Sequence, residues 1–208
     1  TARFAHGEAE THLRHVLRLQ PDHGNAWNNL GVLYRDTLRL KEAIEAFDQA
    51  TSHLPDGSMA QSNRLLTLNY LPSISAEELF AAHESFGVGL GREPRSMTLR
   101  ERDGEPVRIG YVSGDLRRHS VAFFIEPVLE AHDRSRFHIT CYSNDERQDS
   151  VTARLRSLSD RWRDISLLSN EAARALIDED QIDVLVDLSG HSAKNRLTLF
   201  ADRAAPVQ

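Results

Sequence analysis

Residues 24–57 decide the fold of the first part of the chain, and they read GNAWNNLGVLYRDTLRLKEAIEAFDQATSHLPDG. Apolar residues recur in this stretch at the spacing of one helix face, in two sets: Trp27, Leu30 and Tyr34, then Ala43, Phe47 and Ala50. Gly31 lies beside the first set, where the lack of a side chain lets a second helix approach closely. Pro55 ends the second helix, because proline cannot donate the backbone hydrogen bond of a helix interior. The stretch therefore predicts a helical hairpin.

The same positions match the tetratricopeptide signature, W-x₂-L-G-x₂-Y followed by A-x₃-F and a proline within 34 residues. Pro21 and Pro55 stand 34 positions apart, one repeat length. A single hairpin cannot bury its faces alone and needs stacked neighbours. Residues 7–20 predict the second helix of a preceding repeat, and residues 58–70 predict a degenerate helix that closes the stack. The expected array presents a concave protein-binding surface, and we expect this chain to be a piece of a longer one.

Composition excludes several classes of protein. Of the 208 residues 40% are hydrophobic and 27% are charged, which is typical of a soluble globular protein. The net charge of −6 makes nucleic acid a poor default partner. The single Cys141 excludes an internal disulfide and a cysteine-based zinc cluster, and its apolar surroundings predict a buried, inert thiol. His12 and His15 have no third ligand at a recognisable spacing, so no metal is expected.

Targeting signals are also missing from the sequence. No apolar run approaches the roughly 18 residues of a membrane span, and no secretory signal opens the chain. We therefore expect a cytoplasmic protein without a membrane span.

A capped helix and a polar linker follow the repeats. Ser75 and Glu78 fit the capping box, in which each side chain accepts from a backbone N–H at the helix start, and this helix should run to about Ser85. Beyond it the chain is rich in Arg, Glu and Gly and has little apolar periodicity, which predicts a solvated linker. The expected organisation is helical repeats over 1–72, a helical connection and linker over 73–106, and an incomplete α/β lobe over 107–208.

In the last part of the chain short apolar runs alternate with helical patterns. The runs predict strands over residues 107–112, 137–142, 162–165 and 182–188, with the entry to a further strand at 206–208. Helices are predicted over residues 120–132, 149–158, 170–178 and 193–202. Alternating strands and helices imply a parallel sheet that is covered on both faces. The predicted fold is therefore α plus α/β, with the α/β part forming half of a Rossmann-like domain.

Ligands of such sheets bind at the carboxyl ends of the strands. That rule selects residues 113–120 (SGDLRRHS) and residues 189–196 (SGHSAKNR), which should open on the same edge. Ser120 is the predicted N-cap of the following helix, so His119 would stand beside a helix N-terminus that favours anions. A neutral imidazole facing a cleft can accept a proton from a hydroxyl. His119 is therefore a candidate general base and His191 a candidate ligand contact, with ordinary loop histidines as the alternative.

Two other patterns are weaker indications of function. The G-x₃-G from Gly110 to Gly114 lacks the spacing of a dinucleotide site, which disfavours an oxidoreductase. Asp183 and Asp187 stand four positions apart on one strand, or about 13 Å, which disfavours a carboxylate pair. We expect structural or edge-facing roles for both, with a carboxylate pair as the alternative.

Three segments carry a family resemblance: RIGYVSGDLRRH at residues 108–119, DLSGHSAKNRL at 187–197 and APVQ at 205–208. Together with the order of repeats, connection and lobe, they resemble the O-GlcNAc transferase family, which includes the plant SPINDLY proteins. The Gly190-His191 pair is nearer the bacterial and SPINDLY-like form. The resemblance covers essentially the whole chain.

The resemblance implies an inverting, metal-independent GT-B glycosyltransferase that moves a sugar from a UDP-sugar to Ser or Thr of proteins. GlcNAc is the favoured sugar, and fucose stays open. No cofactor is implied. The resemblance also implies a second lobe outside these residues that carries most donor contacts, so this chain alone should be inactive. The expected partners are that C-terminal lobe and an acceptor protein bound by the repeats and the cleft.

The same resemblance proposes His119 as the general base. The candidate substrate-binding residues come from the two selected loops: Gly114, Asp115, Ser120, Gly190, His191 and Asn195. The alternative function, from a different class, is a tetratricopeptide adaptor whose α/β lobe is a non-catalytic scaffold.

Overall fold

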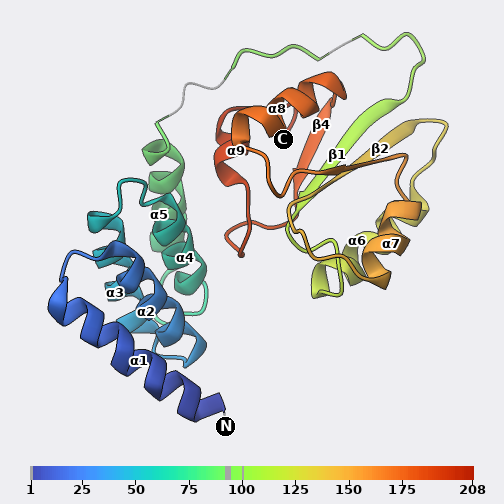
Figure 1. Cartoon of the computed structure of the whole chain (residues 1–208). Helices are drawn as coiled ribbons and strands as arrows, with labels where there is room; N and C mark the ends of the chain where they lie inside the picture. Colours follow the sequence, from blue (N-terminus) through green and yellow to red (C-terminus); the bar gives the residue numbers. More distant parts are fainter. Residues whose placement is uncertain (1, 92–94, 100) are drawn as a thin grey trace. The chain divides into compact units, whose positions relative to one another are not determined.

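The computed structural model of the protein describes residues 2–91, 95–99 and 101–208. The chain forms two compact units, Thr1–Gly91 and Arg92–Gln208. In Figure 1 the first unit runs from blue to green and consists of helices, and the second runs from green to red and contains the sheet.

The first unit is a stack of helices: α1 Ala2–Leu19, α2 Gly24–Asp36, α3 Leu40–His53, α4 Ser58–Leu68 and α5 Ala76–Gly89. α2 and α3 form the predicted hairpin. A Cβ atom on Gly31 would lie 2.6 Å from Cε1 of Phe47, so the close approach predicted for this glycine is confirmed. Leu30 and Tyr34 are buried, whereas Trp27 is half-buried and its indole N–H donates to the Pro21 carbonyl at 2.8 Å.

The ends of these helices follow their capping chemistry. Ser75 accepts from the Glu78 backbone N–H and Glu78 accepts from the Ser75 backbone N–H, so the predicted capping box of α5 is confirmed. α3 ends at His53, just before Pro55. α1 begins at Ala2, five residues before the predicted start, because no helix-breaking residue precedes residue 7 in this stretch.

The second unit is built on a parallel sheet of β1 Val107–Ser113, β2 Phe137–Ser143, β3 Arg161–Asp164 and β4 Val184–Asp187, in the order β3-β2-β1-β4. Its helices are α6 Ser120–Ala131, α7 Ser150–Ser157, α8 Asn170–Glu179 and α9 Leu197–Ala201. Val207 forms a parallel bridge with Val184, which confirms the predicted entry to a further strand beside β4.

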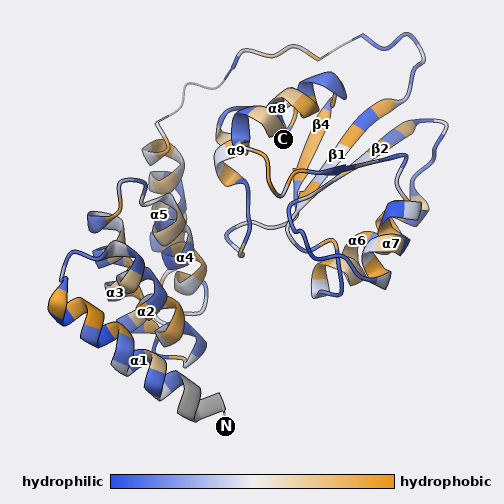
Figure 2. Cartoon of the chain, viewed as in Figure 1, coloured by the Kyte–Doolittle hydropathy of each residue, from blue (hydrophilic) through white to orange (hydrophobic). Residues whose placement is uncertain are grey.

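Neighbouring residues on each strand point to opposite faces of this sheet. Tyr111 and Cys141 belong to the core under α6 and α7, whereas Val112 and Tyr142 belong to the core under α8 and α9. Figure 1 shows the two helix pairs on opposite sides of the strands, and Figure 2 shows the predominantly apolar colouring of β4 between them. The prediction of a sheet covered on both faces is therefore confirmed.

Two predicted elements are shorter in the structure. The predicted strand at 182–188 is reduced to Val184–Asp187, although the backbone N–H groups of Asp183 and Leu188 still donate to carbonyls of β1. The Asp183 carboxylate accepts from the Arg108 backbone N–H at 2.9 Å and pairs with Arg102 at 2.7 Å. The structural role expected of Asp183 is thereby confirmed. The predicted helix at 193–202 is reduced to Leu197–Ala201, because Lys194 has a positive φ of 61° and cannot lie in a right-handed helix. Among the described residues, no helix combines the length and the apolar character that crossing a membrane requires.

Candidate functional site

The two loops selected from the sequence meet at the carboxyl edge of the sheet. β1 and β4 pair as neighbouring parallel strands, so their ends lie side by side. A Cβ atom on Gly114 would lie 2.7 Å from Cβ of Lys194 and 3.2 Å from its carbonyl oxygen. The Gly114 N–H also lies 3.4 Å from the Ser189 hydroxyl oxygen. Gly114 is thus a contact point that lets the loops after β1 and β4 touch.

His119, and not Ser120, is the N-cap of α6, so that detail of the prediction is wrong. His119 has extended backbone angles, φ −152° and ψ 162°, and its Nδ1 accepts the backbone N–H of Val121 at 3.3 Å. Ser120 is already the first helical residue and is exposed. Nδ1 of His119 also lies 3.7 Å from Oδ2 of Asp115, and 38% of the imidazole side chain is exposed. The ring is held at one nitrogen and reaches solvent.

A third loop, after β2, completes this edge and was missed from the sequence. Asp145 is buried, and its carboxylate accepts from Arg117 Nε at 3.0 Å, Arg147 Nη2 at 2.7 Å and Lys194 Nζ at 2.6 Å. These cations, with Arg147 first, hold the pKa of the Asp145 carboxyl well below its usual range. The rule used for the other loops could have found Asp145, because it follows the predicted strand at 137–142.

The Asp145 carboxylate joins all three loops. Arg117 belongs to the loop after β1 and also donates to Asp115 Oδ1 at 3.0 Å, and Lys194 belongs to the loop after β4. By formal charge, the two carboxylates and three cations give this cluster a surplus of one positive charge. The cluster fixes the loops and biases the edge toward anionic ligands.

The loop after β4 is anchored through Arg196 and Asn144. Arg196 donates to the Ile165 carbonyl at 2.7 Å and to Asn144 Oδ1 at 3.1 Å, and its burial lowers the pKa of the guanidinium. Asn144 donates to the Lys194 carbonyl at 2.7 Å. Asn195 donates to the Ser192 carbonyl at 2.9 Å and accepts from the Leu197 N–H, which starts α9. A polar hollow of about 370 Å³ lies here, lined among others by Asn144, Lys194, Asn195 and Arg196.

Asp187 shapes the start of the same loop. Its two carboxylate oxygens accept the backbone N–H groups of Ser189 at 3.0 Å and Gly190 at 2.8 Å. Burial raises the pKa of the Asp187 carboxyl, and these two hydrogen bonds act against that rise. Gly190 has a φ of 52°, a backbone conformation that favours glycine. His191 follows in this turn and is half-buried. The structural role expected of Asp187 is therefore confirmed.

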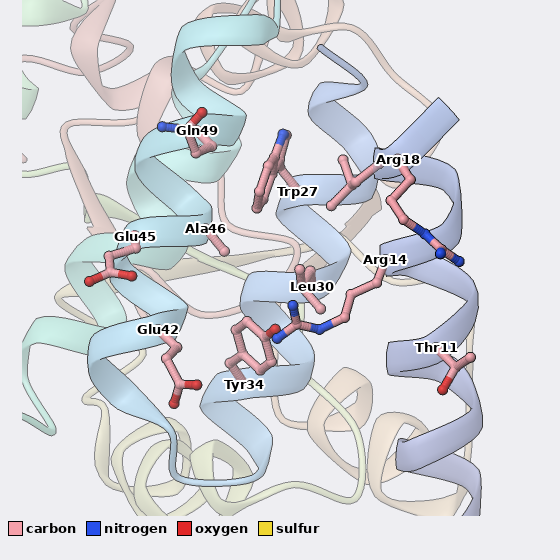
Figure 3. Close-up of a pocket in the computed structure, with 11 residues that line it drawn as sticks. Thr11, Arg14, Arg18, Trp27, Leu30, Tyr34, Glu42, Glu45, Ala46 and Gln49 are labelled. Atoms are coloured by element: carbon pink, nitrogen blue, oxygen red, sulfur yellow. The ribbon is translucent and has the colours of Figure 1, made fainter. Parts of the chain in front are cut away.

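The repeat unit carries a separate groove of about 1040 Å³ between α1, α2 and α3. Arg14 and Arg18 of α1 and Glu42 and Glu45 of α3 line the groove, and in Figure 3 Arg14 reaches from α1 toward Tyr34. The floor between them comes from α2 and is apolar and aromatic, formed by Trp27, Leu30 and Tyr34. The groove thus has a basic rim, an acidic rim and an apolar floor.

The chemistry that this carboxyl edge offers is hydrogen bonding, proton transfer and anion binding. Within residues 2–91, 95–99 and 101–208 the structure contains no group of three or more His, Cys, Asp or Glu side chains that could hold a metal ion. The predicted site residues fall on the loops after β1 and β4, where the structure connects Asp115 with His119 and Gly114 with Lys194. Their roles toward a substrate stay predictions.

Sequence comparison now places this edge in a family. Residues 90–208 match the profile described as glycosyl transferase family 41, and residues 24–56 match the tetratricopeptide repeat. The match to family 41 covers more than half of the chain. The chain belongs to glycosyl transferase family 41.

Named relatives agree with this family membership. The chain is 35% identical over 172 residues to the probable UDP-N-acetylglucosamine–peptide N-acetylglucosaminyltransferase SPINDLY of Oryza sativa subsp. japonica, a match that covers 79% of this chain and 19% of the relative. It is 32% identical over 111 residues to the UDP-N-acetylglucosamine–peptide N-acetylglucosaminyltransferase of Caenorhabditis elegans, covering 51% of this chain and 10% of the relative.

A solved structure is similar over nearly the whole chain. The K341M mutant of the Thermobaculum terrenum O-GlcNAc transferase matches with a TM-score of 0.90 and 38% identity, covering 98% of this chain and 40% of that one. The matched part of this chain therefore spans less than a fifth of the length of each of these two curated relatives, and less than half of the length of the solved transferase.

Proposed function

We propose that this chain is the recognition arm and first catalytic lobe of an inverting, metal-independent enzyme that transfers GlcNAc from UDP-GlcNAc to Ser or Thr hydroxyls of proteins. The observation that carries the proposal is the carboxyl edge itself, in a lobe that matches family 41 from residue 90 to residue 208. The names of the rice and nematode relatives supply the donor and the peptide acceptor. Fucose stays open as the transferred sugar.

His119 is the candidate general base of this reaction. The acceptor hydroxyl gives its proton to the imidazole while its oxygen bonds to the anomeric carbon. The bond from that carbon to the diphosphate breaks, and its electron pair leaves with the nucleoside diphosphate. Attack from the side opposite the leaving group inverts the anomeric centre. The ring is 38% exposed at the edge where Rossmann-like sheets bind their ligands, so an acceptor can reach it.

The remaining candidates surround this position. Gly114, Asp115 and Ser120 belong to the loop that carries His119, and Gly190, His191 and Asn195 belong to the loop that touches it at Gly114. The surplus positive charge around Asp145 suits a diphosphate that approaches the edge. We expect most donor contacts to come from a second lobe, so residues 1–208 should bind UDP weakly. A submicromolar dissociation constant for UDP in calorimetry would contradict this division of the site.

The repeats suit the acceptor protein. Stacked tetratricopeptide hairpins mediate protein interaction, and the groove of α1, α2 and α3 offers an apolar floor between charged rims of opposite sign. We propose that this unit holds segments of the acceptor outside the reaction site. In the alternative, the chain is an adaptor and the α/β lobe only supports the repeats.

A transfer assay separates the two proposals. The longest protein that contains this segment is incubated with acceptor proteins and either UDP-GlcNAc or GDP-fucose, and the masses of the acceptor peptides are measured. Addition of one N-acetylhexosamine to Ser or Thr, only with UDP-GlcNAc, is the expected result. Addition of a deoxyhexose would change the sugar and keep the enzyme class. No transfer from either donor by a folded protein that still binds acceptors would favour the adaptor.

A further inference from the structure

Two groups with opposite requirements face the same nitrogen of His119. The backbone N–H of Val121 lies 3.3 Å from Nδ1 and donates to it, which requires a lone pair on Nδ1. Oδ2 of Asp115 lies 3.7 Å from the same Nδ1 and can only accept, which requires a hydrogen on Nδ1. A neutral imidazole carries one hydrogen, so it can satisfy only one of these groups at a time.

The two positions of the hydrogen have opposite consequences at Nε2, the other ring nitrogen. When Nδ1 caps α6, the hydrogen is on Nε2, and Nε2 donates a hydrogen bond but cannot take a proton. When Nδ1–H faces Asp115, Nε2 has a free lone pair and can act as a base. In the structure Nδ1 caps α6. His119 must therefore give up this capping bond before its Nε2 can act as a general base.

The Asp115 carboxylate is placed to accept the Nδ1–H of His119. Its carboxylate is 9% exposed, and Oδ1 accepts from Arg117 Nη2 at 3.0 Å. The other oxygen, Oδ2, faces the His119 ring at 3.7 Å from Nδ1. The Asp115 backbone N–H donates to the Ser113 hydroxyl at 2.9 Å, which holds the turn in place.

Little movement separates the two arrangements. The contact of 3.3 Å to Val121 is at the long end of N–H···N and N–H···O hydrogen bonds, and the 3.7 Å to Asp115 is just beyond that range. A ring shift of less than about 1 Å exchanges one partner for the other. His119 precedes α6, so the exchange opens one cap and leaves the helix interior intact.

We propose that Asp115 is the positioning residue that turns His119 from a helix cap into a proton acceptor, by taking the Nδ1–H of its ring. The proposal rests on the transfer function proposed above. In the reaction, Nε2 takes the proton of the acceptor hydroxyl as its oxygen bonds to the anomeric carbon, and the nucleoside diphosphate leaves with the electron pair of the broken bond. The resulting imidazolium keeps its Nδ1–H on Asp115, whose negative charge stabilises it. The Val121 N–H loses its partner on the ring during this step.

The ratio of the two neutral tautomers tests the proposal on residues 1–208 without donor or acceptor. Chain labelled with ¹⁵N at histidine is studied by long-range ¹H–¹⁵N correlation at a pH where the His119 ring is neutral, and the His119 signals are assigned by their loss in His119→Ala. Asp115→Asn keeps the shape of the side chain but no longer demands a hydrogen on Nδ1. Val121→Pro removes the competing N–H at the start of α6, where proline is tolerated. Asp133→Asn, at the other end of the helix, is the matched control.

We expect wild type to populate both tautomers. Asp115→Asn should lower the ratio of the Nδ1–H to the Nε2–H form at least about tenfold, as a lost hydrogen bond to a charged group implies. Val121→Pro should raise this ratio, and Asp133→Asn should leave it unchanged. A wild-type ring that is only in the Nε2–H form, or the same ratio in wild type and Asp115→Asn, would overturn the proposal.

Kinetics of the longest protein that contains this segment test the catalytic consequence. Asp115→Asn should lower kcat roughly 10²-fold or more with little change in KM, and Asp115→Glu, which restores the charge, should recover part of the loss. An unchanged kcat in a variant whose tautomer ratio has shifted would overturn the positioning role. Absence of transfer in wild type would instead reject the proposed function, and the tautomer ratio would still decide whether Asp115 controls the ring.

Discussion

Replacing Asp145 by Asn should destabilise the α/β unit, because one buried carboxylate holds the three loops of the candidate site. Asp145 is 2% exposed and accepts from Arg117, Arg147 and Lys194. Asn keeps the shape and one acceptor oxygen but removes the charge. It also leaves three cations near one another without their common counter-ion.

The exposure of the three cations determines how much Asp145→Asn lowers the free energy of unfolding. Breaking a fully buried ion pair costs about 3–5 kcal/mol, because the remaining charge stays buried without a partner. Here the side chains of Arg147 and Lys194 are 64% and 42% exposed and can turn to water, so each of their contacts contributes little. The Arg117 side chain is 22% exposed and cannot leave as easily. We therefore expect a loss of about 2 kcal/mol in the free energy of unfolding.

The two tryptophans make this measurable, since Trp27 lies in the repeat unit and Trp162 lies in β3. In a Trp27→Phe background, urea unfolding followed by fluorescence reports the α/β unit alone. Glu146→Gln, a charge removal at the exposed next position, is the control and should change stability by less than about 0.5 kcal/mol. An Asp145→Asn loss as small as the control would refute the view that Asp145 holds the loops together.

The same carboxylate predicts the pH dependence of the loss. Its pKa in the folded protein is lowered by the cations, so its contribution is present above the ordinary aspartate pKa of about 4 and disappears as the pH falls through the lower folded value. The stability difference between wild type and Asp145→Asn should therefore be constant near neutral pH and shrink below about pH 4. A difference that grows on acidification would contradict the assignment.

Three further predictions concern glycines and the cysteine. Gly31→Ala should destabilise the repeat unit by about 1–2 kcal/mol, because its Cβ would lie 2.6 Å from the buried Phe47 ring. Gly7→Ala should instead stabilise α1 by up to about 1 kcal/mol, because a Cβ there would have nothing within 4 Å. Urea unfolding of both variants checks these opposite signs. Burial raises the pKa of the Cys141 thiol to about 12, so the native protein should react with a disulfide reagent roughly a thousandfold more slowly than the denatured chain, and equal rates would contradict the burial. Gly114→Ala should push the loops after β1 and β4 apart, because the new methyl would meet Lys194 at 2.7 Å, and glycosyl transfer should fall while far-ultraviolet circular dichroism stays the same.

The repeat and the sheet could be predicted because local rules decide them. The spacing of Trp27, Leu30 and Tyr34 fixes one helix face, and Gly31 has to be small for the facing helix to pack. β1, β2 and β4 are short apolar runs between helical patterns, and parallel strands place their carboxyl ends on one edge. These features need no knowledge of distant contacts.

The loop contacts and the helix cap at the candidate site depend on contacts that sequence spacing does not show. Asp145 attracts three cations from two other loops and its own, and the order of residues does not indicate this meeting. His119 caps α6 in place of Ser120, because the extended backbone brings Nδ1 to the Val121 N–H. Arg196 fixes the loop before α9 by donating to the carbonyls of Ile165 and Leu168, which follow β3 in the sequence. Glycosyl transfer itself was predicted from family resemblance, and spacing alone selected only two loops.

The role of His119 is tested most directly by the rate of sugar transfer after removal of its imidazole. Wild type, His119→Ala and His12→Ala are compared in the longest protein that contains this segment, with UDP-GlcNAc and a peptide acceptor under saturating conditions. His12 is exposed on α1, so its variant controls for the loss of a histidine. We expect His119→Ala to lower kcat roughly 10²-fold or more and His12→Ala to match wild type. An unchanged kcat in a folded His119→Ala protein would contradict the proposed role of His119 as general base.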